Sequence, residues 1–262
     1  ILHLLQGRVL HADETPVAQL DPGSGKTQRA YLWAYRSNDF ELRPRIIVFD
    51  YQTSRSGKHV QNFLNSWQGH LLVDDYGGYK ALFSKTASPC TELGCWAHAR
   101  RKFFDLHQAN ASTVAFEALQ RIGKLYAVEA EGKHSSTEAR QILRAEKSLP
   151  ILQSLHDWLL QTRFHTADGG GTARAIDYTL KRWQSLIRYA SSGHLPIDNN
   201  PVENTIRPIA LGKKNWLFTG SERAGKRAAA IQTLLGTAKL NGLNPAQWLA
   251  DPLEKLPIWP NS

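Results

Sequence analysis

Residues 195–218, LPIDNNPVENTIRPIALGKKNWLF, predict a short helix that carries one acidic residue and leads into basic and aromatic residues. Asn200 can cap this helix, because its side chain can accept hydrogen bonds from the first turn. Glu203 and Arg207 then lie one turn apart on the same helical face. Pro208 is expected to end or kink the helix, since proline lacks the N–H that a helix interior needs.

Glu203 has two readings on this stretch alone. Asn-Pro-Val-Glu, residues 200–203, is close to a capping box, in which the glutamate bonds back to the backbone amide of the capping residue. Pro201 fits that arrangement, because a proline in the first helical turn loses no intrahelical bond. The other reading makes Glu203 part of a site with acidic residues elsewhere in the chain.

The charge balance favours a polyanionic partner. The 262 residues carry a formal net charge of +9 and a sequence pI of about 9.6. Nucleic acid is the first expectation and an anionic membrane surface the second. No apolar run reaches the roughly 18 residues that a transmembrane helix needs. Cys90 and Cys95 are too few for a disulfide framework, which favours a reducing cytosol.

The first hundred residues predict an α/β fold with a mixed sheet. Strands are expected at residues 7–17, 30–36, 45–51, 71–73 and 92–96, where β-branched and aromatic residues alternate or run together between turn residues. Helices are expected at residues 57–67, shortly after Gly77 and Gly78, and at residues 97–107. Three consecutive strands followed by alternating helices and strands are typical of such a sheet.

Residues 107–190 predict a helical module. They are rich in Ala, Leu, Gln, Glu, Lys and Arg, with apolar residues at helical spacing and no strand pattern. We expect three to five helices, with a break at the three glycines of residues 169–171. Two further helices are expected near the end of the chain, at residues 221–242 and from Pro245 onward.

A phosphate-binding loop is not expected, although residues 23–27, GSGKT, resemble part of one. The full pattern needs a glycine at Leu20, a buried strand before the loop and a helix after it. A polar stretch precedes the loop and a strand pattern follows it. We therefore interpret residues 21–29 as a basic hairpin loop and expect no nucleotide cofactor.

Three carboxylates are candidates for a metal site. Asp13 and Asp74 are expected at the ends of the first and fourth strands, and Glu203 in the late helix. Clustered carboxylates repel one another unless a cation is bound, and hard oxygen ligands suit Mg²⁺ or Mn²⁺. Glu14 and Asp75 are neighbouring rivals, and adjacent strand residues point to opposite faces, so only one of each pair can serve the site.

Four segments together resemble the catalytic region of insertion-sequence-66 type transposases: HADETPV, DDYGGY, CWAHARRKF and IDNNPVENTIRPIALGKKNWLF. These transposases belong to the DDE superfamily and have a ribonuclease H-like core. The resemblance implies a five-stranded mixed sheet with helices, interrupted by an all-helical insertion and followed by C-terminal helices. It implies a first core part at residues 1–106, the insertion at 107–190, the closing helix of the core at 191–220 and a helical tail at 221–262.

The resemblance also implies roles for individual residues. Asp13, Asp74 and Glu203 match the three acidic residues that hold two Mg²⁺ or Mn²⁺ ions, although Asp75 stands where the family usually has glycine. Cys95 and His98 match a Cys-x-x-His pattern that we interpret as a structural junction. A metal site is the alternative, although two residues are two short of the four ligands of a structural zinc site. DNA contacts are expected from Arg100, Arg101, Lys102, Arg207, Lys213, Lys214 and Trp216, with a solvated helix face or core packing as the alternatives for some of them.

The leading hypothesis is a metal-dependent DNA transposase that cleaves and joins strands as a homodimer on transposon ends and target DNA. We expect a bacterial cytoplasmic, nucleoid-associated protein with no membrane partner. Relatives carry N-terminal DNA-binding segments, so the chain is interpreted as a catalytic fragment or a truncated copy. The alternatives are a hydrolytic ribonuclease H-like nuclease and an inactive DNA-binding remnant.

Overall fold

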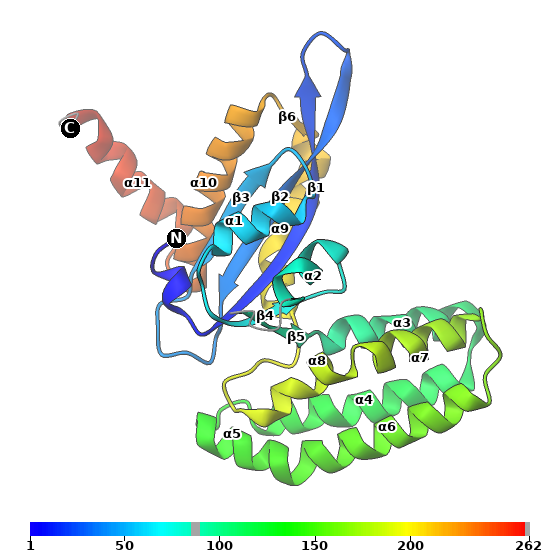
Figure 1. Cartoon of the computed structure of the whole chain (residues 1–262). Helices are drawn as coiled ribbons and strands as arrows, with labels where there is room; N and C mark the ends of the chain where they lie inside the picture. The colour runs from blue at the N-terminus through cyan, green and yellow to red at the C-terminus, as the bar shows by residue number, and fades with distance from the viewer. Residues whose placement is uncertain (85–89, 260–262) are drawn as a thin grey trace. The chain divides into compact units, whose positions relative to one another are not determined.

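The computed structural model describes residues 1–84 and 90–259 (Figure 1). Its strands form one mixed sheet of six strands in the order β3-β2-β1-β4-β5, with β6 paired to β1. This confirms the α/β class and a ribonuclease H-like fold, with one short strand more than expected. The described chain divides into two compact units: residues 1–69, 77–84 and 201–259 form the first, and residues 70–76 and 90–200 form the second.

Three antiparallel strands organise the first unit. They are β1 (Val9–Asp21), β2 (Lys26–Ser37) and β3 (Ile47–Gln52). A tight turn joins β1 to β2, and its Gly23 and Gly25 have φ values of 89° and 67°, which glycine adopts without strain. This confirms the predicted hairpin at GSGKT. The expected end of the first strand was wrong, because β1 continues to Asp21 and Asp13 therefore lies inside the strand.

Helices and one short strand complete the first unit. Its helices are α1 (Gly57–Leu64), α2 (Gly77–Phe83), α9 (Asn200–Trp216), α10 (Glu222–Leu240) and α11 (Pro245–Lys255), with short 3-10 turns at Leu4–Gln6 and Leu256–Ile258. Strand β6 (Phe218–Thr219) pairs parallel to β1 at Ala18 and Gln19. Side-chain caps begin three of the helices: Ser56 for α1, Ser221 for α10 and Asn244 for α11.

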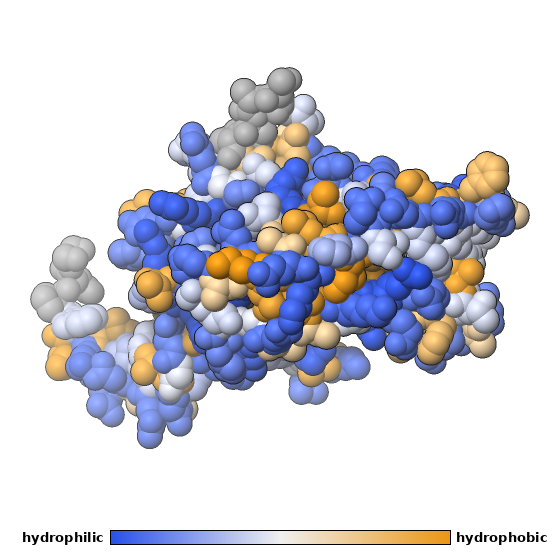
Figure 2. All heavy atoms as spheres, turned by 90° about the horizontal axis from the view of Figure 1, so that it is seen from below, coloured by the Kyte–Doolittle hydropathy of each residue, from blue (hydrophilic) through white to orange (hydrophobic). Residues whose placement is uncertain are grey.

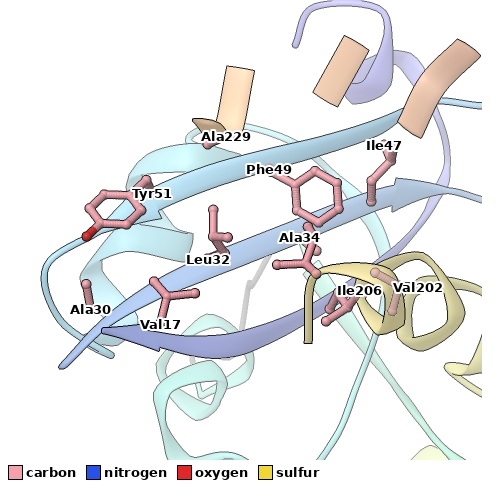
Figure 3. Packing of buried hydrophobic residues seen from close by; sticks show 11 residues of the cluster. Val17, Ala30, Leu32, Ala34, Ile47, Phe49, Tyr51, Val202, Ile206 and Ala229 are labelled. Carbon is pink, nitrogen blue, oxygen red and sulfur yellow. The ribbon is translucent and has the colours of Figure 1, made fainter. Parts of the chain in front are cut away.

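One face of the three-stranded part is covered by α9 and α10. Figure 3 shows the buried cluster on this face, with Val202 and Ile206 of α9 beside Ala34 of β2. Helix α10 packs along β3 and contributes Ala229 (Figure 1). The spacing of the buried α9 residues is three to four positions, so one stripe of the helix faces the sheet. Strands β1, β2 and β3 and helices α9 and α10 are thus held together by one apolar core.

Pro208 does not end α9, contrary to expectation. The helix continues to Trp216, with Pro208 on its exposed side. Ile206 and Ile209 flank this proline in sequence and are both buried, with exposed fractions of 5% and 6%. Packing of these two side chains holds the helix on the sheet and offsets the missing hydrogen bond of the proline.

The second unit combines two strands with a set of helices. Its elements are β4 (Gly69–Val73), β5 (Cys90–Gly94), α3 (Trp96–Asn110), α4 (Thr113–Glu131), α5 (Thr137–Leu143), α6 (Leu149–Phe164), α7 (Gly171–Lys181) and α8 (Trp183–Ile187). A π-helical turn at Arg144–Ser148 joins α5 to α6, and a 3-10 turn at Arg188–Ser191 follows α8.

The predicted helical character of residues 107–190 is confirmed. Five α-helices, α4 to α8, lie within this range, every residue of which the structure describes. The break at the three glycines is also confirmed, since α6 ends at Phe164 and α7 begins at Gly171, with Gly169 at a φ of 78°. None of the helices in residues 1–84 and 90–259 is long and apolar enough to span a membrane. The face of the molecule in Figure 2 is largely hydrophilic, with hydrophobic residues in smaller groups.

Candidate active site

Asp13 lies on the sheet face that α9 covers. It stands directly opposite Ala34 in the antiparallel pairing of β1 with β2, and Ala34 stands opposite Phe49 of β3. Residues directly opposite in adjacent strands point to the same face of a sheet. Ala34 and Phe49 both belong to the core cluster that includes Val202 of α9. The half-buried Asp13 carboxylate therefore projects on the same side of the sheet as α9.

Glu14 points to the opposite face, where its carboxylate is held by two partners. Tyr79 donates its hydroxyl to Glu14 Oε2 at 2.6 Å, and Arg55 Nε donates to Oε1 at 2.7 Å. The Glu14 side chain is 1% exposed. Burial, followed by the Glu14 charge, raises the pKa of Tyr79 well above its usual value, so the phenol remains a donor. These contacts give Glu14 a structural role and distinguish it from Asp13.

Glu203 lies at the edge of the buried stripe of α9. At 100° per residue it is turned about 90° from the direction shared by Val202, Ile206 and Ile209. It is half-buried, whereas Arg207 on the same flank is exposed. Lys214 is also exposed and lies about three turns beyond Glu203 on this flank. The first unit therefore combines Asp13, on the face that α9 covers, with an α9 carboxylate flanked by basic residues.

The start of α9 weakens the capping reading of Glu203. Asn200 is itself the first helical residue, contrary to its predicted place as the cap. Its backbone N–H donates to Asp198 Oδ1 at 3.1 Å, and its side-chain amide donates to Asp198 Oδ2 at 2.8 Å. In a capping box the glutamate accepts the first of these bonds. Asp198 accepts it here, so Glu203 is not required for that role.

Asp74 and Asp75 are distinguished by their contacts in the second unit. Asp74 directly follows β4, as predicted, and its Oδ1 accepts the backbone N–H of Tyr76 at 2.9 Å. Asp75 accepts a hydrogen bond from Arg182 Nη1 at 2.7 Å, and Arg182 also bridges to Glu92 at 2.8 Å. Arg182 thus ties Asp75 to the helical part of its unit, which favours Asp74 as the candidate ligand.

Asp75→Asn is expected to lower the stability of the second unit by about 1–3 kcal/mol, because it weakens a charge-assisted bond to the buried Arg182. Asp74→Asn should leave stability within about 1 kcal/mol, since the amide oxygen can still accept the Tyr76 N–H. Urea unfolding followed by far-UV circular dichroism measures both. Equal stability of the two variants would contradict the different roles assigned to these carboxylates.

Cys95 contributes to a junction within the second unit. Its Sγ accepts the backbone N–H of Asn199 at 3.2 Å, and the backbone N–H of Trp96 donates to Ile197 at 3.1 Å. The Trp96 indole donates to the Leu186 carbonyl at 2.9 Å. These bonds connect the start of α3 to the segment that leads toward α9. His98, one turn into α3, is half-buried.

The basic residues of α3 differ in their surroundings. Arg100 and Arg101 line a hollow of about 440 Å³ together with Phe104 and Tyr126, and all four belong to the second unit. The Arg100 guanidinium lies 5.9 Å from the centre of the exposed Phe104 ring. Lys102 instead lies 5.4 Å from the Tyr178 ring of α7. Arg100 and Arg101 are therefore better placed than Lys102 for an external anion.

The basic end of α9 is largely exposed. Lys214 is exposed, whereas the half-buried Lys213 donates to the Pro16 carbonyl of β1 at 3.0 Å. Trp216 is 41% exposed, so it is not the core residue that was the alternative expectation. These side chains form a basic and aromatic surface on the first unit.

Sequence reasoning missed the residues that hold the rival carboxylates. Tyr79 is the last residue of DDYGGY, and its bond to Glu14 links this segment to HADETPV. Glycine is required at position 57 because the backbone passes close to Gly78: a Cβ at Gly57 would lie 2.2 Å from the Gly78 carbonyl oxygen. The local sequence does not indicate the roles of Arg55 and Arg182, because the carboxylate that each one binds lies far away in sequence.

Comparisons with known proteins identify a family for this chain. The family model described as transposase IS66 family matches residues 2–227, and the model described as IS66 C-terminal element matches residues 233–262. Uncharacterized protein y4qI of Sinorhizobium fredii (strain NBRC 101917 / NGR234) is 38% identical, over 98% of this chain and 49% of its own length. Uncharacterized protein y4hP of the same strain is 34% identical, over 97% of this chain and 49% of its own length. The chain thus spans about half the length of these curated relatives.

Proposed function

The chain belongs to the IS66 family of transposases, and on this premise we propose that it is the part that cleaves and joins DNA strands. The observation that carries the proposal is that Asp13 and α9 lie on the same face of the sheet. The strand register puts Asp13 on the face that this helix covers, and the helix carries Glu203 with exposed Arg207 and Lys214 on one flank. Carboxylates next to basic residues suit a reaction on a phosphodiester.

The residues fit a divalent cation site. Asp13, Asp74 and Glu203 supply carboxylate oxygens, the donors that Mg²⁺ and Mn²⁺ prefer. Their neighbours Glu14 and Asp75 each accept a hydrogen bond from an arginine side chain. A pair of bound ions would supply activation of a water or 3′-hydroxyl and stabilisation of the leaving oxygen. We assign all three carboxylates to holding this pair.

The basic residues would position the DNA. Arg207 offers charge to the phosphates next to Glu203, and Lys214 offers it about three helical turns beyond Glu203 along α9. Arg100 and Arg101 offer a separate basic surface on the second unit. The partly exposed Trp216 is suited to stacking on an unpaired base. Lys213 has a partner in the Pro16 carbonyl, so we expect a smaller contribution from it.

Strand joining with pre-nicked DNA tests the proposal. The substrate is a duplex of the insertion-sequence end with a free 3′-hydroxyl, mixed with a supercoiled target plasmid. We expect joined product with Mg²⁺ or Mn²⁺ and none with EDTA, and at least about a 100-fold loss for Glu203→Gln. Asn204→Ala, an exposed neighbour on α9, is the matched control and should retain full activity.

A second readout separates metal binding from joining. Electron paramagnetic resonance of Mn²⁺ should show weaker binding to Glu203→Gln than to the wild-type chain, whether or not DNA is present. Cleaved but unjoined DNA would support a hydrolytic nuclease instead. Tight DNA binding without Mn²⁺ binding or cleavage would support an inactive remnant, and either result would overturn the proposed strand transfer.

A further inference from the structure

The end of α10 lies beside the segment that leads into β3 (Figure 1). A basic hollow lies at this place in the first unit. It has a volume of about 580 Å³ and is lined by Arg43, Arg45, Lys239, Leu240, Asn241 and Gly242. Three of these six residues are cationic and none is acidic. The segments that form it are nearly 200 positions apart in sequence, and the family's C-terminal element supplies one of them.

Hydrogen bonds fix the two sides of the hollow to each other. The Asn241 side-chain amide donates to the Arg45 carbonyl at 2.7 Å, and the Arg45 backbone N–H donates to Asn241 Oδ1 at 3.2 Å. One helical turn earlier, the Thr237 hydroxyl donates to the Ile47 carbonyl at 3.1 Å. The backbone around the hollow is therefore held in place, and its long basic side chains extend from a fixed frame.

The positive charge of the hollow is only partly balanced. Arg45 lies 3.1 Å from Asp39, but this carboxylate also accepts two hydrogen bonds from Arg36. Arg43 donates to the neutral side chain of Gln6 at 3.2 Å. The carbonyl end of α10 attracts Lys239, yet a helix end is equivalent to only about half a charge. A net positive charge remains at an exposed surface, which suits a polyanion.

The sheet geometry gives the separation between the hollow and Asp13. Asp13, Ala34 and Phe49 form one row across three strands, so Phe49 lies about 10 Å from Asp13. Arg45 precedes Phe49 by four positions, or about 13 Å of extended chain. The two displacements are nearly perpendicular and combine to about 16 Å. At about 3.4 Å per base pair, this is roughly five base pairs of DNA.

We propose that the hollow binds the phosphodiester backbone of duplex DNA about five base pairs from the phosphate that reacts at Asp13 and Glu203. This inference rests on the proposed function and adds a second DNA contact to it. The hollow carries no aromatic side chain for base stacking, so backbone charge is the feature it recognises. It acts in positioning the duplex and is not catalytic.

The test uses the double variant Arg43→Gln/Lys239→Gln in the full chain. Lys226→Gln is the control, because this lysine is also on α10 but is already paired with Glu222 at 2.6 Å. Duplex binding is measured by fluorescence anisotropy over a range of KCl concentrations. We expect the slope of log affinity against log salt to become shallower by about 1 for each lost phosphate contact, and the control to match the wild type.

Duplex length locates the contact. Two further duplexes are shortened to three base pairs on one side or the other of the joining position. The loss of duplex affinity in the double variant should disappear with one of these duplexes and persist with the other. A wild-type salt slope, or a loss that persists with both shortened duplexes, would overturn the proposal. Joining at saturating DNA should remain at the wild-type rate, so a failure of the chemistry is distinguishable from a failure of this contact.

Discussion

Asp13→Asn is expected to reduce Mg²⁺-dependent strand joining by about 1,000-fold or more while leaving the fold intact. The change removes the charge of a carboxylate on the α9 face of the sheet but keeps its size and its capacity to accept the N–H of Glu14, now 2.8 Å from Oδ1. A bound metal contributes several kcal/mol to the stabilisation of a reacting phosphate, and about 4 kcal/mol corresponds to that loss in rate. Joining of pre-nicked DNA measures it.

Glu14→Gln is the matched control, one residue away on the opposite face. Its carboxylate is buried and bonded to Arg55 and Tyr79, so the neutral amide should cost about 1–3 kcal/mol of unfolding free energy. Joining per folded molecule should remain within a few-fold of the wild type. Loss of joining in Glu14→Gln with normal joining in Asp13→Asn would reverse the two roles and remove Asp13 from the site.

The contrast between these neighbours shows where sequence reasoning stopped. Alternation along a strand predicts that Asp13 and Glu14 face opposite ways, but it does not say which face holds the site. The answer depends on what packs on each face. Val202 of α9 packs on one side, and Tyr79 of α2 on the other. Both contacts join segments distant in sequence, and local pattern carries no information about them.

Element types were predicted best where hydrophobic packing is regular. The helical stretch at residues 107–190 and the strand before Asp74 have clear apolar patterns and were predicted correctly. The outer half of the first hairpin was missed because residues 21–29 are exposed on both faces and show no alternation. The length of α9 was missed because packing around Pro208 outweighed its helix-breaking tendency. Tertiary contacts decided only the second case.

Arg144→Met should have the largest effect on stability, a loss of about 3–5 kcal/mol in the second unit. The Arg144 side chain is fully buried and pairs with Glu129 through Nε at 2.8 Å and Nη2 at 2.6 Å. Its Nη1 lies within 2.6–2.9 Å of the carbonyl oxygens of Tyr189, Ser192 and Leu195. Methionine fills similar space but leaves a carboxylate and these carbonyls without their donor. Urea unfolding monitored by far-UV circular dichroism measures the loss.

Arg163→Met tests whether this loss comes from burial and not from the removal of any arginine. Arg163 also has two carboxylate partners in the second unit, Asp168 and Asp177, but both are exposed. Exposed ion pairs contribute about 0–1 kcal/mol, so this variant should unfold near the wild-type urea concentration. Adding Glu129→Met to Arg144→Met should recover part of the stability, because it removes the unpaired carboxylate. Similar losses in Arg144→Met and Arg163→Met would show that Arg144 does not anchor the segment from Tyr189 to Leu195.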